Sequence, residues 1–287
     1  MGTLFVVATP IGNMEDVTLR ALRVLREVDL IAAEDTRTTR ALLTHHAIHA
    51  KLVSYNEHNM RTRTPQLLTA LENRDIALVS EAGTPGVSDP GHELVLTVIE
   101  AGFPVVSIPG PSAVIAALAA SGLSMRGFTF LGFLPRRASQ RRRFLTEVAT
   151  EPRTLVLFEA PHRLRQTLED IRSTLGDRRT AVCRELTKAF EEVFRGTVAE
   201  ALQHFTEPRG EFTLVLEGAA EEDADVTDAA IIEALKRHLA GRASPRDAAR
   251  LVAAELGVAR RRVYGLSVRL REPIPQPRRK ASRPSGR

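Results

Sequence analysis

Short apolar runs alternate with amphipathic stretches along the first part of the chain. The runs are rich in Val, Ile and Leu, and between them apolar residues recur three to four positions apart, as in Leu19, Leu22 and Leu25. These patterns predict strands at residues 3–8, 29–33, 51–54, 75–80 and 104–108. They predict helices at residues 17–27, 36–46, 61–73, 91–101 and 112–120. Strands that alternate with helices favour a mostly parallel sheet covered on both faces.

A second series of the same kind follows Gly122. We expect strands at residues 128–133, 154–158, 180–183 and 212–216, and helices at residues 139–148, 162–175 and 198–205. The sequence therefore predicts an α/β fold of two tandem lobes, residues 1–121 and 122–218. A cleft between two such lobes is the expected ligand site.

The last part of the chain has a different pattern. Residues 219–225 have the acidic composition of a linker, and helical patterns follow at residues 227–240, 244–255 and 259–270. Ser244-Pro245 is a helix start, and Gly257 separates the last two helices. Residues 226–272 are therefore expected to form a small helix-turn-helix-like domain, a layout that often contacts nucleic acid. Residues 273–287, rich in Pro, Arg and Ser, are expected to be a disordered basic tail.

Composition excludes several classes of protein. The chain has 287 residues, of which 43% are hydrophobic and 26% charged, as in ordinary globular proteins. Cys183 is the only cysteine, so neither an intrachain disulfide nor a cysteine zinc cluster can form, and a reducing cytoplasm is the expected location. The longest apolar run is far shorter than the roughly 20 residues that span a bilayer, and no signal peptide is recognisable. We therefore expect a soluble cytoplasmic protein.

The charge is distributed unevenly along the chain. Residues 1–225 carry 25 basic and 30 acidic residues, whereas residues 226–287 carry 15 basic and five acidic ones. A basic C-terminal part suggests a polyanionic partner, with nucleic acid as the first candidate, although a solvated basic tail is the alternative.

Several common catalytic motifs are absent from the sequence. There is no phosphate-binding G-x-x-x-x-G-K-[ST], no G-x-G-x-x-G after the first strand, no H-E-x-x-H and no G-x-S-x-G. His45, His46 and His49 lie close together, but we interpret them as surface histidines and expect no metal site.

Glycine- and proline-rich loops follow four predicted strands at their carboxyl ends. They are Thr-Pro-Ile-Gly-Asn (9–13), Ala-Glu-Asp-Thr-Arg (33–37), residues 80–91 with Glu-Ala-Gly-Thr-Pro-Gly, and Pro-Gly-Pro-Ser-Ala (109–113). The carboxyl ends of parallel strands are where open α/β sheets bind ligands. Four such loops at one sheet edge therefore predict a binding site.

These loops carry a resemblance to a known family. Together with Gly-Phe-Leu-Pro (132–135), Leu-Phe-Glu-Ala-Pro-His-Arg (157–163) and Arg-Glu-Leu-Thr-Lys (184–188), they resemble the RsmI family of ribosomal RNA small-subunit methyltransferases, which has the tetrapyrrole-methylase fold. The resemblance runs from about residue 2 to residue 218. It implies S-adenosylmethionine-dependent methylation of a cytidine ribose 2′-hydroxyl in the decoding centre of 16S ribosomal RNA by a homodimer. We expect the 30S subunit as the substrate, and the sequence leaves free 16S RNA as the alternative.

The resemblance also implies cofactor-binding residues. They are Pro10, Glu81, Gly83, Thr84, Val87, Ser112, Ala113, Phe158, Leu186 and Thr213. Glu81 stands where the family has Asp, which preserves the carboxylate but puts a tight geometric role in doubt. Ser112 also has the alternative role of a helix N-cap.

Methyl transfer to a hydroxyl requires alignment and removal of a proton. The candidate catalytic residues are Glu34, Asp35, Arg37, Glu185 and Lys188. A carboxylate could accept the proton while a basic side chain lowers the pKa of the alcohol. Asp35–Arg37 and Arg184–Glu185 could instead be structural ion pairs, and the sequence leaves the identity of the base open.

An RNA substrate needs a basic surface. Five arginines follow the first strand of the second series, and three more lie in the last predicted helix: Arg136, Arg137, Arg141, Arg142, Arg143, Arg260, Arg261 and Arg262. We expect these side chains to contact RNA phosphates.

Two other functions stay open at this point. A tetrapyrrole C-methyltransferase of the same fold would make little use of the basic C-terminal part, and such enzymes usually carry Gly-Asp-Pro where this chain has Gly83-Thr84-Pro85. A non-catalytic nucleic-acid-binding protein that senses S-adenosylmethionine would bind the cofactor without turnover.

Overall fold

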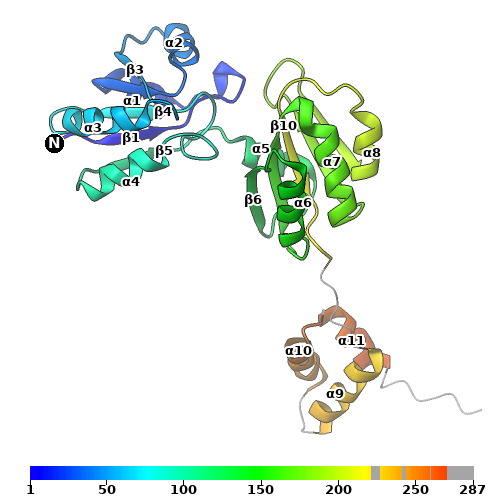
Figure 1. The fold of residues 1–287 in the computed structure, drawn as a ribbon. Coiled ribbons are helices and arrows are strands. Elements are labelled where there is room, and N and C mark those ends of the chain that lie inside the picture. The colour runs from blue at the N-terminus through cyan, green and yellow to red at the C-terminus, as the bar shows by residue number, and fades with distance from the viewer. Residues whose placement is uncertain (221–226, 241–243, 259, 270–287) are drawn as a thin grey trace, which may run out of the picture. The chain divides into compact units, whose positions relative to one another are not determined.

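The computed structural model describes residues 1–220, 227–240, 244–258 and 260–269, without the side chains of Pro245, Arg261 and Arg269. The chain divides into two compact units, Met1–Ala219 and Ala220–Arg287 (Figure 1). The first unit contains both sheets, and the described part of the second is helical. The predicted tail at residues 273–287 lies outside the described residues.

The first sheet is wholly parallel. Its strands are β1 (Leu4–Val7), β2 (Leu30–Ala33), β3 (Leu52–Ser54), β4 (Ile76–Val79) and β5 (Val105–Ile108). They lie in the order β3-β2-β4-β1-β5, and each pair of neighbours is parallel. This arrangement confirms the predicted parallel sheet. It also makes β1 and β4 neighbours, so the loops that follow these two strands meet.

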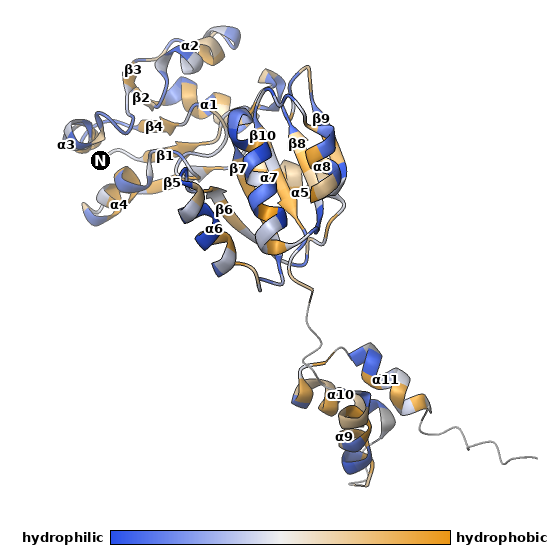
Figure 2. Cartoon of the chain, turned by 45° about the vertical axis from the view of Figure 1, so that its right-hand side comes forward, coloured by the Kyte–Doolittle hydropathy of each residue, from blue (hydrophilic) through white to orange (hydrophobic). Residues whose placement is uncertain are grey.

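Helices cover both faces of this sheet. Helices α1 (Leu19–Glu27) and α2 (Thr36–His45) pack on one face, and α3 (Met60–Leu71) and α4 (His92–Glu100) pack on the other. Figure 2 shows mainly hydrophobic strands and helices of mixed character, as expected when amphipathic helices cover a buried sheet.

The second sheet is mostly antiparallel. Its strands are β6 (Phe128–Phe133), β7 (Thr154–Glu159), β8 (Arg179–Arg184), β9 (Glu192–Thr197) and β10 (Phe212–Leu216), in the order β6-β7-β10-β8-β9. Only β6 and β7 run parallel. The sequence patterns missed β9, because its residues Glu-Val-Phe-Arg-Gly-Thr contain no continuous apolar run. It is a half-buried edge strand, which pairs with β8 alone.

Four helices complete the second lobe. On one face lie α6 (Ala138–Glu147), α7 (Pro161–Leu175) and α8 (Val198–His204). On the other face, α5 (Ala113–Ser121) buries Val114 and Leu118 against strand residues that include Val156 and Val215. The predicted boundary after residue 121 places this helix in the first lobe, whereas the apolar face of α5 is buried against the second sheet.

The C-terminal unit contains three described helices. They are α9 (Asp228–Ala240), α10 (Pro245–Leu256) and α11 (Arg260–Arg269), and they share a core that includes Leu235, Val252 and Val263. Gly257, with φ of 65°, ends α10. The α/β fold with two tandem lobes and C-terminal helices is therefore confirmed. None of the described helices is long and apolar enough to cross a membrane.

Candidate active site

Loops from both lobes of the first unit enclose a cavity of about 530 Å³. The loops after β1 and β4, the start of α5 and the ends of several strands of the second sheet form its walls. All ten residues that the resemblance assigned to the cofactor line this cavity: Pro10, Glu81, Gly83, Thr84, Val87, Ser112, Ala113, Phe158, Leu186 and Thr213. The structure thus brings together residues as far apart in the sequence as Pro10 and Thr213.

A short antiparallel bridge joins the loop after β1 and the loop after β4. The N–H of Thr9 donates to the carbonyl oxygen of Gly83 at 2.8 Å, and the N–H of Gly83 donates to the carbonyl oxygen of Thr9 at 3.1 Å. Gly83 has a φ of +76°, a conformation that favours glycine. Because its N–H is already used, Gly83 contributes shape rather than a hydrogen-bond donor to the cavity wall.

The loop after β1 also packs against the loop after β8. The N–H of Asn13 donates to Oγ1 of Thr187 at 3.0 Å. A Cβ placed on Gly12 would clash with Cγ of Lys188 and lie 2.8 Å from Oγ1 of Thr187. The absence of a side chain at Gly12 therefore allows the two loops to form one continuous wall beside Lys188.

Two half-buried carboxyl groups, Glu34 and Asp89, line the cavity. Burial raises the pKa of Asp89 to about 7, and the neighbouring charges of Glu34 and Glu81 add to this effect, while the Ser80 hydroxyl opposes it. Burial also raises the pKa of Glu34, with contributions from the charges of Glu81, Glu57 and Asp35. Asp89 is thus a group that can hold or release a proton near neutral pH.

Sequence reasoning identified Glu34 but missed Asp89. Asp89 lies in the turn-rich segment after β4, where a carboxylate next to proline and glycine is typical of a turn. Its position within the long loop 80–91 was the only available signal. Only the folded chain shows that this loop carries the carboxyl group into the cavity.

Glu34 is held in place by the backbone of the β4 loop. Its Oε2 accepts a hydrogen bond from the N–H of Glu81 at 3.0 Å. The side chain of Glu81, where the family has Asp, is exposed and lies on the cavity wall. The backbone contact does not depend on the extra methylene of Glu81, so the anchoring of Glu34 tolerates this replacement.

Asp35 and Arg37, two predicted catalytic residues, pair with each other. Asp35 is the N-cap of α2 and accepts a hydrogen bond from the N–H of Arg37 at 2.7 Å, while Nη2 of Arg37 lies 2.8 Å from Oδ2 of Asp35. Side-chain and backbone hydrogen bonds from Arg37 lower the pKa of Asp35 to about 2. Neither residue lines the cavity. The geometry favours the structural alternative for this pair.

Lys188 lines the cavity and is paired with two carboxylates. Its Nζ lies 3.2 Å from Oε1 of Glu185 and 2.9 Å from Oε2 of Glu211. Desolvation opposes the charged form of Lys188, but the hydrogen bonds and charges of these carboxylates outweigh it and raise its pKa. Lys188 therefore presents a fixed positive charge to the cavity.

Glu185, by contrast, is directed to the backbone. Its Oε1 accepts from the N–H of Glu211 at 2.8 Å, and the residue does not line the cavity. Burial disfavours the charge of Glu185, but the hydrogen bond from Glu211 and the contact with Lys188 outweigh burial and lower its pKa. Glu185 positions Lys188 and does not itself face the cavity.

Ser112 occupies the N-cap position of α5, but its side chain makes no capping hydrogen bond. Ser112, Ala113 and Val114 all line the cavity, so the first turn of α5 faces it. The first N–H groups of a helix have no partner within the helix and attract anionic groups. The hydroxyl group and these donors suit the carboxylate end of an amino acid ligand.

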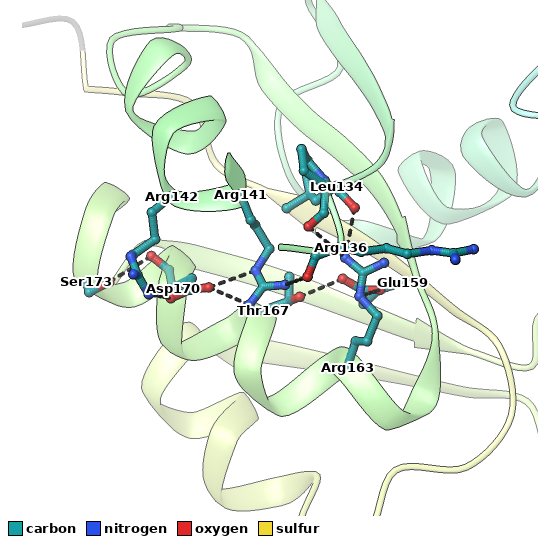
Figure 3. A network of polar contacts seen from close by, with 10 residues as sticks. Leu134, Arg136, Arg141, Arg142, Glu159, Arg163, Thr167, Asp170 and Ser173 are labelled. Atoms are coloured by element: carbon teal, nitrogen blue, oxygen red, sulfur yellow. Dashed lines mark hydrogen bonds and ion pairs between the residues drawn. The ribbon is translucent and has the colours of Figure 1, made fainter. Parts of the chain in front are cut away.

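The five arginines that follow β6 do not form one exposed basic surface (Figure 3). Arg141 is fully buried, with Nε 2.7 Å from Oδ2 of Asp170, so our prediction that this side chain contacts RNA is wrong. It lies on the inner face of α6, where it packs towards α7 instead of solvent. Arg142 also pairs with Asp170, at 3.3 Å, but remains 54% exposed.

The other predicted RNA contacts lie on the surface where they are described. Arg136, Arg137 and Arg143 are exposed, and Arg143 pairs with Glu147 on its own helix. In the C-terminal unit, Arg260 is exposed and Arg262 lies 2.8 Å from Asp228. The side chain of Arg261 lies outside the described residues.

The sequence of this chain is similar to those of a known family of methylases. Residues 3–202 match the family of Tetrapyrrole (Corrin/Porphyrin) Methylases. A protein from Halalkalibacterium halodurans named "Ribosomal RNA small subunit methyltransferase I" is 47% identical over 272 residues, which is 92% of this chain and 94% of that protein. A protein of the same name from Thermotoga maritima is 49% identical over 221 residues, which is 76% of this chain but 99% of that protein.

A solved structure gives the same fold. The crystal structure of uroporphyrin-III C-methyl transferase from Thermus thermophilus, complexed with S-adenosyl homocysteine, matches with a TM-score of 0.56 and 22% identity. The match covers 75% of this chain and 97% of that chain. The chain belongs to the tetrapyrrole methylase family, in which it groups with the ribosomal RNA small subunit methyltransferases I.

Proposed function

We propose that this protein methylates the 2′-hydroxyl of a cytidine in the decoding centre of 16S ribosomal RNA, acting in the cytoplasm as a homodimer on the 30S subunit. The names of the relatives and the loop motifs support ribosomal RNA as the substrate. The observation that carries the proposal is the cavity itself, in which Asp89, Glu34 and Lys188 lie beside all ten expected cofactor residues.

The cavity fits S-adenosylmethionine in size and chemistry. A volume of about 530 Å³ is in the range of small-molecule sites. Phe158, Leu186 and Val87 give apolar walls for an adenine ring, and the start of α5 suits the carboxylate of the amino acid end. Glu34 and Asp89 provide negative charge for a sulfonium cation. When bound, S-adenosylmethionine supplies a methyl group on positively charged sulfur, which becomes a neutral thioether when a hydroxyl oxygen attacks.

Asp89 is the proposed proton acceptor. A carboxylate with a pKa of about 7 is available in its ionised form near neutral pH and accepts a proton more readily than an ordinary aspartate. Burial and then repulsion by Glu34 keep the pKa of Asp89 high, and Lys188 on the opposite lobe stabilises negative charge that develops on the attacking oxygen. Proton removal and charge stabilisation are thus assigned to two different lobes.

The exposed arginines are proposed to bind the RNA backbone. Arg136, Arg137, Arg142 and Arg143 lie on the segment that follows β6, and Arg260 lies on α11. Each phosphate that they neutralise would add a salt-dependent increment to the affinity.

The test is methyl transfer from labelled S-adenosylmethionine to purified 30S subunits that lack the modification, with free 16S RNA and uroporphyrinogen III as alternative substrates in separate reactions. We expect label on one cytidine, in the 2′-O-methyl ribose form, after nuclease digestion and mass spectrometry. Label on uroporphyrinogen instead would indicate a tetrapyrrole enzyme. S-adenosylmethionine binding without transfer to RNA or tetrapyrrole would indicate a sensor, and either result would overturn the proposal.

A further inference from the structure

A bulge in β6 brings three aromatic rings together beside the cavity. Residues three positions apart on a regular strand point to opposite faces. In β6 the pairing shifts between Phe130, opposite Val156, and Phe133, opposite Phe158, which inserts one extra residue. Gly132, with φ of +63°, lies within this bulge. Phe130 and Phe133 therefore lie on the same face, and their ring centroids lie 5.0 and 5.5 Å from that of Phe158.

Phe133 is the ring of this trio that meets solvent. It is 54% exposed and at the same time lines the cavity, so it lies where the cavity opens. A ring this exposed leaves apolar surface that a ligand could cover. Phe158, farther in, is only partly accessible and lines the same cavity. The ring of Phe133 is thus an apolar surface at the entrance to the methyl-donor site.

Arg163 holds the backbone of the segment after Phe133 in place (Figure 3). Nη2 of Arg163 donates to the carbonyl oxygens of Leu134 and Pro135, at 2.8 and 3.2 Å. Arg163 is itself held by Glu159, whose Oε1 lies 3.3 Å from its Nε and whose Oε2 accepts from the Thr167 hydroxyl at 2.6 Å. The side chain of Glu159 is fully buried, so this support is shielded from water.

Two exposed arginines, Arg136 and Arg137, follow Phe133 in the chain. Nη1 of Arg141 lies 3.4 Å from the carbonyl oxygen of Arg136, which ties the backbone of the segment down. The side chain of Arg136 extends away from this network in Figure 3, and Arg137 is also exposed. An aromatic ring with adjacent arginines is the arrangement that binds a base by stacking and its phosphates by charge.

We propose that Phe133 is the stacking platform for the base of the nucleotide whose ribose is methylated. This inference rests on the proposed function, since it assumes an RNA substrate. A 2′-hydroxyl inside a helical stem would be difficult to insert into the cavity, so the target nucleotide must be flipped out of the base stack. Stacking on Phe133 holds the turned-out base at the entrance, which leaves its ribose directed at the cavity.

The test compares Phe133→Leu with Phe128→Leu in the full-length protein. Both phenylalanines belong to β6, but Phe128 lies at the other end of the strand, is 40% exposed and does not line the cavity. Loss of one base–aromatic stack should lower kcat/KM for 30S subunits by about fivefold or more in Phe133→Leu. The affinity for S-adenosylhomocysteine should not change, Phe128→Leu should match the wild type, and Phe133→Tyr should retain activity.

Each outcome separates this inference from the function on which it rests. If the wild type transfers no methyl group to 30S subunits, the proposed function fails and the inference falls with it. If the wild type is active and Phe133→Leu has the same kcat/KM, only the inference fails. If Phe133→Leu instead loses affinity for S-adenosylhomocysteine, Phe133 is a cofactor wall and the inference is overturned.

A fluorescence experiment provides a direct readout of stacking. The chain contains no tryptophan, so Phe133→Trp and Phe128→Trp each introduce a single reporter. A single-stranded RNA that carries the target cytidine is added until its binding, followed by anisotropy of a label on the RNA, is saturated. We expect the RNA to quench the indole fluorescence of the Phe133→Trp protein but not that of the Phe128→Trp protein. Equal signals from the two reporters would overturn the inference.

Discussion

Nη2 of Arg141 lies 2.6 Å from Oδ2 of Asp170, and the Arg141 side chain has no exposed surface. The guanidinium also approaches the carbonyl oxygen of Arg136, so it joins α6, α7 and the segment after β6. A run of arginines in the sequence therefore contains one residue that supports the others. Arg141 holds the backbone at Arg136 and is too deeply buried to contact RNA.

Arg141→Met is expected to destabilise the protein strongly. Removal of one partner of a buried ion pair leaves the other charge without compensation, which costs about 3–5 kcal/mol of unfolding free energy, reduced here because Arg142 remains near Asp170. The matched control Arg142→Met removes a guanidinium that is 54% exposed and should cost about 1 kcal/mol or less. Urea unfolding followed by circular dichroism measures both. Equal losses in the two variants would contradict the assigned roles.

Asp89 is expected to make stability depend on pH. Its pKa is raised from 3.8 to about 7 in the folded state, so between these values the folded chain holds a proton that the unfolded chain has lost. The contribution of Asp89 to the free energy of unfolding is therefore fully present below pH 3.8 and is lost as the pH rises through about 7. Relative to Asp89→Asn, the wild type should lose stability over this range. A constant difference between the two at all pH values would show that Asp89 does not titrate in this way.

Asp89 and Glu34 should make the affinity for the methyl donor depend on pH more strongly than the affinity for its product. S-adenosylmethionine carries a sulfonium charge, whereas S-adenosylhomocysteine has a neutral sulfur. A cation beside Asp89 and Glu34 favours their ionised forms, so the donor should release a proton on binding and bind more tightly as the pH rises towards 7. Over this pH range, the affinity for the donor should increase by about tenfold for each unit by which the sulfonium lowers the pKa of Asp89.

Isothermal titration calorimetry at several pH values, in buffers of different ionisation enthalpy, checks this expectation. Affinity for S-adenosylhomocysteine should depend less on pH than affinity for the donor, and Asp89→Asn should remove most of the difference. Identical pH profiles for the two ligands would place the sulfonium away from Asp89.

Gly12→Ala is expected to disturb the cavity wall without a change in any polar group. Its Cβ would lie too close to Lys188 and Thr187, and overpacking of this kind costs about 1–3 kcal/mol. Because Lys188 must move to make room, we also expect a lower rate of methyl transfer and weaker S-adenosylhomocysteine binding. Gly265→Ala, in α11, is the control, since a Cβ there meets no atom within 4 Å and alanine favours a helix. A Gly12→Ala protein with normal activity and stability would contradict the close packing of the two loops.

The sequence predicted most of the elements because their patterns are local. Every strand of the first sheet was found, since each is an apolar run between amphipathic helices, and the loops at the strand ends indicated the binding edge. Strand β9 was missed because an edge strand is stabilised by its neighbour β8 and not by its own apolar content. The lobe to which α5 belongs is likewise decided by packing, because its apolar face is buried against the second sheet.

The site was less predictable than the fold, for a physical reason. The roles of Asp89 and Phe133 depend on features that no local pattern records, namely burial beside Glu34 and a one-residue bulge. Arg141 was assigned to the site although it is a buried structural residue. A charged residue within a basic run has the same sequence pattern whether it faces solvent or Asp170. Residue type indicated the chemistry in these cases, and only the tertiary contacts assigned the role.

The unit Met1–Ala219 is expected to fold and bind the cofactor without the C-terminal helices. Its hydrophobic clusters contain no residue of α9, α10 or α11, and every residue that lines the cavity precedes Ala219. The Thermotoga maritima relative, matched over 221 residues and 99% of its length, is about as long as this unit alone. A protein truncated after Ala219 should therefore unfold cooperatively and bind S-adenosylhomocysteine like the full chain.

The same truncation should weaken binding to RNA. Residues 226–287 carry 15 basic and five acidic residues, and each phosphate contact that is lost should reduce the slope of log K against log salt by about 0.7–0.9. Binding of 30S subunits at several salt concentrations measures this slope for the truncated and full-length proteins, with Phe128→Leu as a folded control of full length. A reduced slope with unchanged cofactor affinity would assign the C-terminal unit to the RNA, because salt dependence counts phosphate contacts directly. An identical slope would leave the segment after β6 as the main electrostatic contact and make the basic C-terminal charge a solvated surface.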